Sequence, residues 1–185
     1  PTTFGSEPAK GYLQRAEALA GYVEQADILC QAGVDLLVVE MIGDIEQGSL
    51  AVQAACATGL PVWLGFSCRK TAAGELMLWD RGHTLSEGVA AISPIGGSAA
   101  FIMHTDVTDA VQAFTELKSS WSGVLGIYAH SGVFVMPNWQ FNDVISPTDY
   151  AREAGIWVDM GARIIGGCCG IGPVHIAELK KRFCS

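Results

Sequence analysis

Residues 33–40 read Gly-Val-Asp-Leu-Leu-Val-Val-Glu, a glycine and then a short apolar run that ends in a carboxylate. The run is apolar at consecutive rather than alternate positions, which is typical of a strand buried on both faces of a parallel sheet. Just upstream, the apolar spacing of residues 12–32 predicts an amphipathic helix that Gly33 ends. We therefore expect a buried strand at 35–40. The order of helix, glycine and buried strand indicates an α/β fold.

The same unit recurs along the rest of the chain. We expect further strands over 62–67, 99–104, 124–128 and 163–165, and helices over 44–58, 85–92, 108–119, 147–160 and 173–183. Asp44 is the predicted cap of its helix, with Gln47 as capping-box partner. Residues 69–83 are expected to form a polar excursion or hairpin, and residues 131–146 a long loop. The pattern predicts one parallel sheet of five strands, covered by helices.

Composition restricts the class of protein. Of the 185 residues, 50% are hydrophobic and only 16% are charged, which excludes an intrinsically disordered chain. The formal net charge is −8 without basic clusters, so we expect no nucleic-acid partner. Apolar runs such as 34–41 fall well short of the ~18 residues of a membrane span, so we expect no membrane partner. We interpret residues 1–185 as one domain.

The cysteines and the first residues indicate the compartment. Six cysteines are few for this length, and most stand singly in apolar surroundings, as buried free thiols do. Residues 1–5 have neither a basic start nor an apolar core and do not resemble a signal peptide. We therefore expect a reducing, cytoplasmic location.

Polar side chains gather where the predicted strands end. These residues are Glu40, Ser67, His104, Tyr128, His130 and Cys168. In parallel α/β folds the carboxyl ends of the strands meet at one edge, and that edge carries the chemistry. We therefore expect the functional site there.

The most specific motif is Gly-Gly-Cys-Cys-Gly-Ile-Gly at 166–172. A disulfide between neighbouring cysteines is disfavoured, because their Cα atoms lie only ~3.8 Å apart. Two thiolates on one soft cation are easier, since the flanking glycines let the backbone aim both sulfurs inward. Two alternatives remain open: small buried residues at a tight turn, or a phosphate cradle before the last helix.

The segment 166–176 resembles the signature of the zinc-dependent homocysteine S-methyltransferases, the family of betaine–homocysteine methyltransferase and the homocysteine module of methionine synthase. Residues 32–40, 62–67 and 128–132 resemble other family segments in the same order. The resemblance implies a (β/α)₈ barrel in which Zn²⁺ activates homocysteine as a thiolate, which accepts a methyl group from an unknown donor to form methionine. It also implies that Cys168 and Cys169 bind zinc, that Glu40 binds the amino group of homocysteine, and that Ser67 assists.

The chain departs from the family pattern in two ways. A complete barrel needs about 250 residues, whereas this sequence supplies units corresponding to strands 4–8. It is either a fragment or closes its sheet in another way, and we expect its open edges to promote self-association. The family's third zinc ligand, a cysteine in an Asn-Cys pair, aligns with His104-Thr105. His104 is then the provisional third ligand, although strand alternation could point it elsewhere; His130 is a second candidate.

Two other functions stay open at this stage. Loss of the third cysteine and of three barrel units would suit a truncated or degenerate paralogue without catalysis. The glycine-rich segment before the last helix would suit a phosphate-binding barrel enzyme, although it holds no lysine or arginine. His175, in the first turn of that helix, is expected to be a surface or capping group, and Cys68 a buried lone thiol.

Overall fold

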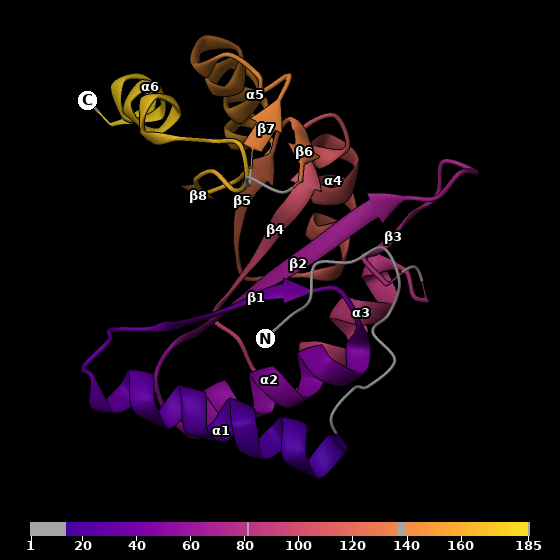
Figure 1. The fold of residues 1–185 in the computed structure, drawn as a ribbon, viewed down its shortest axis with the longest axis vertical. Coiled ribbons are helices and arrows are strands. Elements are labelled where there is room, and N and C mark those ends of the chain that lie inside the picture. The colour runs from indigo at the N-terminus through magenta and orange to yellow at the C-terminus, as the bar shows by residue number, and fades with distance from the viewer. Residues whose placement is uncertain (1–13, 81, 137–139, 185) are drawn as a thin grey trace.

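The computed structural model describes residues 14–80, 82–136 and 140–184. The helices are α1 (Arg15–Gln31), α2 (Ile45–Ala57), α3 (Leu85–Ile92), α4 (Ala110–Ser120), α5 (Pro147–Asp159) and α6 (Pro173–Phe183). The strands are β1 (Leu37–Ile42), β2 (Val62–Lys70), β3 (Leu76–Leu78), β4 (Ala99–Asp106), β5 (Val124–His130), β6 (Val133–Val135), β7 (Gln140–Asn142) and β8 (Ile164–Ile165). Figure 1 shows these elements along the chain.

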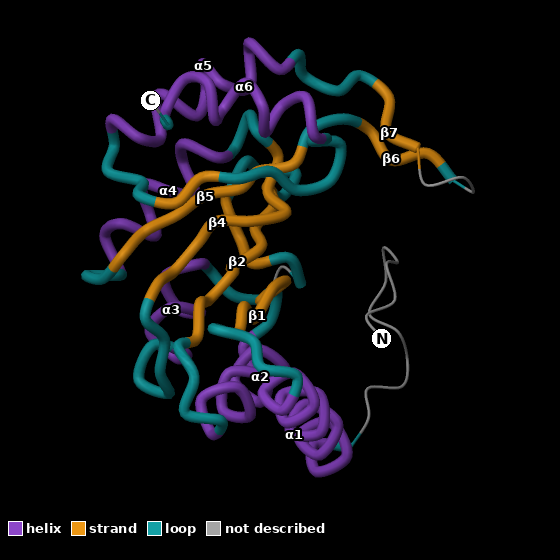
Figure 2. Tube along the Cα trace, turned by 90° about the vertical axis from the view of Figure 1, so that its left-hand side faces the viewer, coloured by secondary structure: helices purple, strands orange, loops and turns teal. Residues whose placement is uncertain are grey.

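The main sheet confirms the predicted parallel topology. Its strands lie in the order β1-β2-β4-β5-β8, and each neighbouring pair is parallel. Figure 2 shows the sheet curving, with the helices arranged around its outer side. Among the described residues, β1 pairs only with β2 along this path and β8 only with β5, so the sheet does not close. The fold is the predicted partial (β/α)₈ barrel.

Local sequence explains where several elements begin. The Asp44 carboxylate accepts a 2.7 Å hydrogen bond from the Gln47 backbone N–H, which caps α2 as predicted. The other half of the predicted capping box is not seen, because the Gln47 side chain instead accepts from the Tyr22 hydroxyl at 3.2 Å. Helix α3 has the predicted bounds and a complete capping box between Thr84 and Glu87.

Two connections have more structure than a loop. The predicted hairpin within 69–83 is confirmed, because β3 pairs antiparallel with the end of β2. The segment 131–146 was expected to be a long loop, but it contains the antiparallel pair β6–β7, in which Phe134 faces Phe141. Figure 2 shows this hairpin extending away from the sheet. Aromatic contact explains the pairing, since the two rings lie 5.5 Å apart.

The core lies between the sheet and the helices. Leu64, Phe66, Ile102 and Ile127 are fully buried there, and Trp157 of α5 is the largest side chain with no exposure. Each such side chain contributes roughly 1.5–3 kcal/mol when removed from water. This packing fixes the outer face of the sheet and therefore the direction in which alternate residues point to the inner face.

The inner face, opposite the helices, is only partly covered by the described residues. Val38 is 41% exposed, although it lies within β1. A hollow of about 160 Å³ opens there. It is lined by Val38, Glu40, Trp63, Phe101, Tyr128, Ile164, Ile165 and Gly166.

Candidate metal centre

The cysteine pair lies in a loop that hydrogen bonds to the end of β5. The Cys168 N–H donates to the Ala129 carbonyl at 3.2 Å, and the Cys169 carbonyl accepts from the Ser131 N–H at 3.1 Å. Gly170 has φ +78°, and a Cβ there would overlap the Ser131 carbonyl oxygen. The glycine is therefore needed both for its backbone conformation and for the close approach of two backbones.

His104 reaches the same place from β4 because that strand is irregular. Its φ is +43°, in the left-handed region that non-glycine residues rarely adopt. The pairing of β4 with β5 shifts register between Met103 and Asp106, as at a β-bulge. Simple alternation, which cast doubt on the orientation of His104, therefore does not hold at this position.

Thr105, the residue aligned with the family's third cysteine, is not at the metal-ligating position. It is fully buried. Its hydroxyl donates to the Met103 carbonyl at 3.0 Å and accepts from the Cys68 N–H at 3.0 Å. The residue that lies beside the two cysteine sulfurs is His104 instead.

His104, Cys168 and Cys169 bring three potential ligand atoms within 4.8 Å of one another. The Nδ1 atom of His104 lies 3.7 Å from each sulfur, and the sulfurs are 3.9 Å apart. Tetrahedral zinc, with Zn–S near 2.3 Å and Zn–N near 2.0–2.1 Å, requires about 3.8 Å between sulfurs and about 3.6 Å between sulfur and nitrogen. The residues present therefore fit such an ion.

The protonation states follow from burial. Burial, with a smaller effect of the neighbouring His130, lowers the pKa of His104 to about 4. A neutral imidazole keeps a lone pair for a metal. Burial, and next the charge of Cys169, raises the pKa of Cys168 to about 11. Without a cation two thiolates would repel each other, so metal binding at this site must release protons.

His130, the second candidate ligand, is not part of the cluster that the described residues form. Its Nε2 lies 3.7 Å from a carboxylate oxygen of Asp106, and its ring lies 5.0 Å from that of His104. A second ring, that of Trp79, also lies close to His104, with 4.8 Å between the two ring centres. Trp79 was missed by sequence reasoning, because residues 69–83 carried no signal beyond a polar hairpin.

Glu40 lies on the inner face, where its carboxylate accepts a 3.0 Å hydrogen bond from the Tyr128 hydroxyl. The side chain is exposed, although the strand that carries it was expected to be buried on both faces. Gly65, between them in the sheet, makes this contact possible, because a Cβ there would lie 3.1 Å from the Tyr128 hydroxyl. Burial, and next the charge of Glu40, raises the pKa of Tyr128, so the hydroxyl stays a donor.

Ser67 is fully buried inside β2, because the strand continues to Lys70 instead of ending at residue 67 as predicted. Its hydroxyl donates to the His104 carbonyl at 3.2 Å. In the structure, Ser67 therefore contacts the backbone of His104. Its contact with a substrate stays a prediction. Cys68, next to it, is 1% exposed, and burial raises its pKa to about 12, which confirms the expected buried lone thiol.

Backbone amides of the glycine-rich segment before α6 donate hydrogen bonds to other residues of the chain. The Gly172 N–H donates to Nδ1 of His175 at 3.2 Å, and the Ile171 N–H donates to the Cys168 carbonyl at 3.1 Å. His175 is therefore a capping group, as predicted, but it is buried rather than on the surface. With these amides occupied, the alternative of a phosphate cradle has little support.

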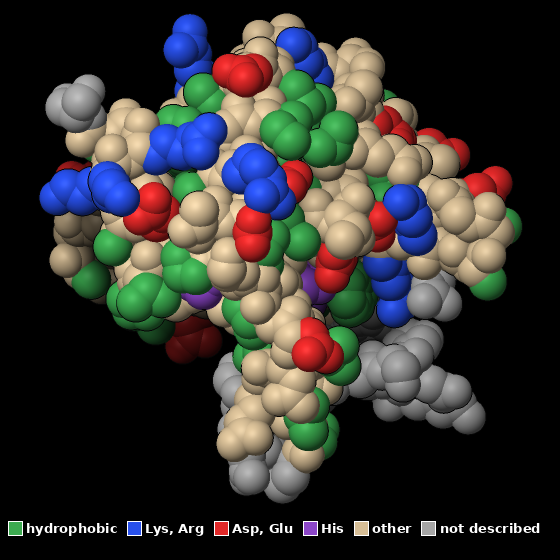
Figure 3. Space-filling model, turned by 90° about the horizontal axis from the view of Figure 1, so that it is seen from above, with side chains coloured by type: hydrophobic (Ala, Val, Ile, Leu, Met, Phe, Trp, Pro, Cys, Tyr) green, Lys and Arg blue, Asp and Glu red, His purple; other side chains and the backbone are tan. Residues whose placement is uncertain are grey.

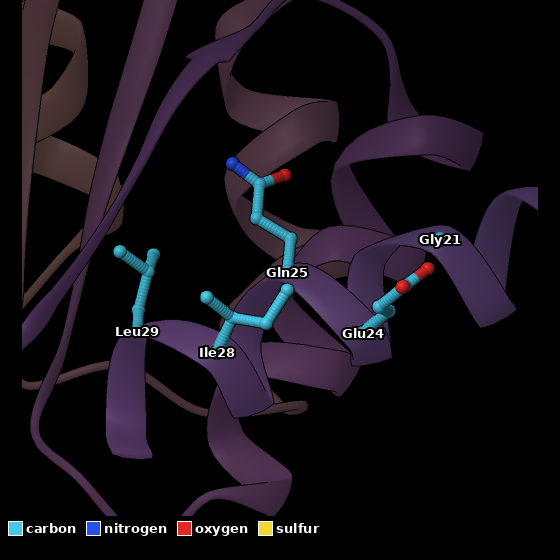
Figure 4. A pocket seen from close by; sticks show the side chains of 5 residues that line it. All are labelled: Gly21, Glu24, Gln25, Ile28 and Leu29. Atoms are coloured by element: carbon cyan, nitrogen blue, oxygen red, sulfur yellow. The ribbon is translucent and has the colours of Figure 1, made fainter. Parts of the chain in front are cut away.

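Other surfaces of the described chain lack such a cluster. A hollow on the outer face of α1 is lined by Gly21, Glu24, Gln25, Ile28 and Leu29, all from one helix (Figure 4). On the face that Figure 3 shows, acidic and basic side chains are interspersed. Among the described residues, no helix has the length and apolar composition needed to cross a membrane.

A partial parallel barrel with a His/Cys/Cys cluster at the carboxyl edge of its strands defines the class: an α/β-barrel protein with a candidate thiolate metal centre. Comparison with known proteins gives the family. The family model for homocysteine S-methyltransferase matches residues 2–183. The chain belongs to that family.

Relatives agree with this assignment. Betaine–homocysteine S-methyltransferase 1 of Bos taurus is 26% identical over 188 residues, which cover 88% of this chain and 43% of that protein. Homocysteine S-methyltransferase YbgG of Bacillus subtilis (strain 168) is 25% identical over 187 residues, covering 95% and 55%. The chain thus spans about half the length of these relatives.

The fold is also that of a solved structure. The metallated form of the homocysteine methyltransferase MmuM from Escherichia coli superimposes with a TM-score of 0.74 at 24% identity. The match covers 94% of this chain and 54% of that one. The common fold places the partial barrel among complete barrel enzymes.

Proposed function

We propose that this chain carries the metal- and homocysteine-binding part of a homocysteine S-methyltransferase, in which a homocysteine thiolate accepts a methyl group and becomes methionine. The observation that carries the proposal is the spacing of Nδ1 of His104 and the two sulfurs, 3.7, 3.7 and 3.9 Å. Those spacings suit one tetrahedral cation. Family membership supplies the substrate class.

Cys168, Cys169 and His104 would hold Zn²⁺, with three protein ligands as in catalytic zinc sites. Zinc, when bound, supplies the positive charge that makes a substrate thiol, of ordinary pKa near 8.5, a thiolate at neutral pH. The backbone of the cysteine loop is fixed to β5 through Ala129 and Ser131. The backbone that carries both sulfurs is thereby fixed, which lowers the entropy cost of binding.

Glu40 would bind the ammonium group of homocysteine. Its carboxylate is exposed on the inner face and lines the hollow there. The Tyr128 hydroxyl donates to it at 3.0 Å and restricts its orientation. A carboxylate attracts a cationic amine, and a fixed one loses less entropy on binding. Ser67 would contribute through the His104 carbonyl that it holds.

The proposal is tested by zinc content and by competition with a chromophoric chelator. The wild-type chain should bind one zinc ion, and Cys169→Ser should lower the affinity strongly. Cys184→Ser is the matched control, since that thiol is exposed and does not belong to the cluster. Substoichiometric zinc that Cys169→Ser leaves unchanged would overturn the proposal and favour a degenerate paralogue.

The substrate is tested on the Co²⁺-loaded chain. Homocysteine should change the visible absorption spectrum, because a third sulfur ligand adds a charge-transfer band, whereas homoserine, with oxygen in place of sulfur, should not. Glu40→Gln should weaken the response to homocysteine while zinc affinity stays as in the wild type. An identical spectrum with and without homocysteine would contradict the assigned substrate.

A further inference from the structure

The imidazole of His104 has two other rings close to it. The Trp79 ring centre is 4.8 Å away with an interplanar angle of 55°, and the His130 ring centre is 5.0 Å away with an angle of 45°. These separations lie within the range of favourable aromatic contacts. The ring thus has neighbours from the β3–α3 connection and from β5, in addition to the two sulfurs.

His104 needs such support more than the cysteines do. Adjacent residues carry the two sulfurs, and backbone hydrogen bonds hold their loop. The imidazole instead projects from a strand irregularity with φ +43°, and rotation about two side-chain bonds would turn Nδ1 away. A strained backbone in this region persists only where its surroundings determine it.

Trp79 is itself held rigidly. Its backbone N–H donates to the Ser67 carbonyl at 3.0 Å, and the backbone N–H of Asp80 donates to the Gly43 carbonyl at 3.0 Å. Gly43 leaves room for the indole, because a Cβ there would lie 2.8 Å from Cβ of Trp79. The Arg69 guanidinium lies 4.8 Å from the indole centre. The hairpin therefore presents Trp79 to His104 in a fixed position.

His130 ends β5, which pairs with β4 on the side away from β2. Its carbonyl accepts from the Val107 N–H at 3.0 Å, and its Nε2 faces the Asp106 carboxylate at 3.7 Å. Both partners belong to the segment that directly follows His104. The second histidine is therefore tied to the same irregular part of β4 that carries the first.

We propose that Trp79 and His130 are positioning residues of the metal centre: their rings fix the plane of the His104 imidazole so that Nδ1 points at both cysteine sulfurs, and neither binds the metal. The inference rests on the proposed zinc site. Outer partners that orient ligands of other metal sites affect metal affinity typically 10–100-fold. The same range is expected here.

The experiment measures zinc affinity by chelator competition and the Co²⁺ absorption spectrum for Trp79→Leu and Trp79→Phe in the full chain. Trp79→Leu should lower zinc affinity about 10–100-fold and weaken the d–d bands of tetrahedral Co²⁺, whereas Trp79→Phe, which keeps a ring, should recover most of both. Trp121→Leu is the matched control, because Trp121 is equally half-buried and packs against Gly97 and Gly123 instead.

His130 is tested in the same way by His130→Ala and His130→Phe. If its ring acts by contact, His130→Phe should preserve the Co²⁺ spectrum and His130→Ala should not. Loss in both variants would mean that the site needs a ring nitrogen of His130 instead of contact with its ring, and it would overturn this role of His130. Zinc affinity in Trp79→Leu equal to wild type, or lowered equally by Trp121→Leu, would overturn the role of Trp79. A wild-type chain that binds no zinc would overturn the proposed function as well, so the two failures are distinguishable.

Discussion

Replacing Gly170 with alanine tests whether the cysteine loop depends on close contact with β5. Gly170 and Gly59 both have φ +78°, so Gly59→Ala is a control with the same backbone conformation. A Cβ at Gly59 would have no atom within 4 Å, whereas one at Gly170 would overlap the Ser131 carbonyl oxygen. The two variants therefore share the left-handed penalty, about 1–2 kcal/mol, and differ in steric overlap.

The overlap adds about 1–3 kcal/mol to the destabilisation by Gly170→Ala, the usual cost of overpacking. For a domain of this size 1 kcal/mol corresponds to about 2–4 °C in Tm. Gly170→Ala should therefore melt roughly 2–12 °C below Gly59→Ala. Displacement of the loop should also break the backbone hydrogen bond from Ser131 to Cys169. Because that hydrogen bond holds the cysteine loop, zinc affinity should fall in Gly170→Ala and not in Gly59→Ala.

Thermal unfolding of the metal-free chain, followed by circular dichroism, measures the first effect, and chelator competition measures the second. Using the metal-free chain separates stability from zinc binding, because a ligand that binds only the folded state raises Tm. Equal Tm and equal zinc affinity in the two variants would refute the reasoning, since the close contact would then have no energetic consequence.

Two further predictions concern hydrogen bonds to a glutamate carboxylate. Tyr128→Phe removes the hydroxyl that donates to Glu40. Because Glu40 is exposed, we expect the free energy of homocysteine binding to weaken by only about 0.5–1.5 kcal/mol, measured by calorimetry on the zinc-loaded chain. Unchanged binding would exclude a role for this hydroxyl. Hydrogen bonds from the Thr84 backbone and hydroxyl lower the pKa of Glu87 below 4.5. The cap of α3 should therefore be fully stabilising above pH 4.5 and lost as pH falls through the lower, folded-state pKa; urea unfolding of Glu87→Gln should lack this acid dependence.

Much of the fold could be predicted from local pattern. Helix α3 has the predicted bounds, since Thr84 and Glu87 form its capping box within four residues. Strand β1 lies two residues later than predicted, because its pairing with β2 begins where Leu37 meets Val62. The position of a strand's first residue depends on its neighbour, which a single segment does not reveal.

For the candidate site too, part could be predicted from the sequence and part could not. Cys168 and Cys169 are adjacent, so the motif alone indicated a metal site. Trp79 could not be found, because its contact with His104 depends on how the β2–β3 hairpin folds. Nor could the sequence show that the Ser67 hydroxyl faces a backbone carbonyl.

By itself, the sequence determined the order of helices and strands, the parallel sheet and the pair of thiols, because helix caps, apolar periodicity and neighbouring cysteines act over a few residues. Only the tertiary structure decided that His104, rather than Thr105, completes the cluster. That choice depends on a register shift between β4 and β5, which gives His104 its left-handed backbone and turns its ring toward sulfurs 64 and 65 residues away. Such a choice belongs to strand pairing, which no local stretch of sequence encodes.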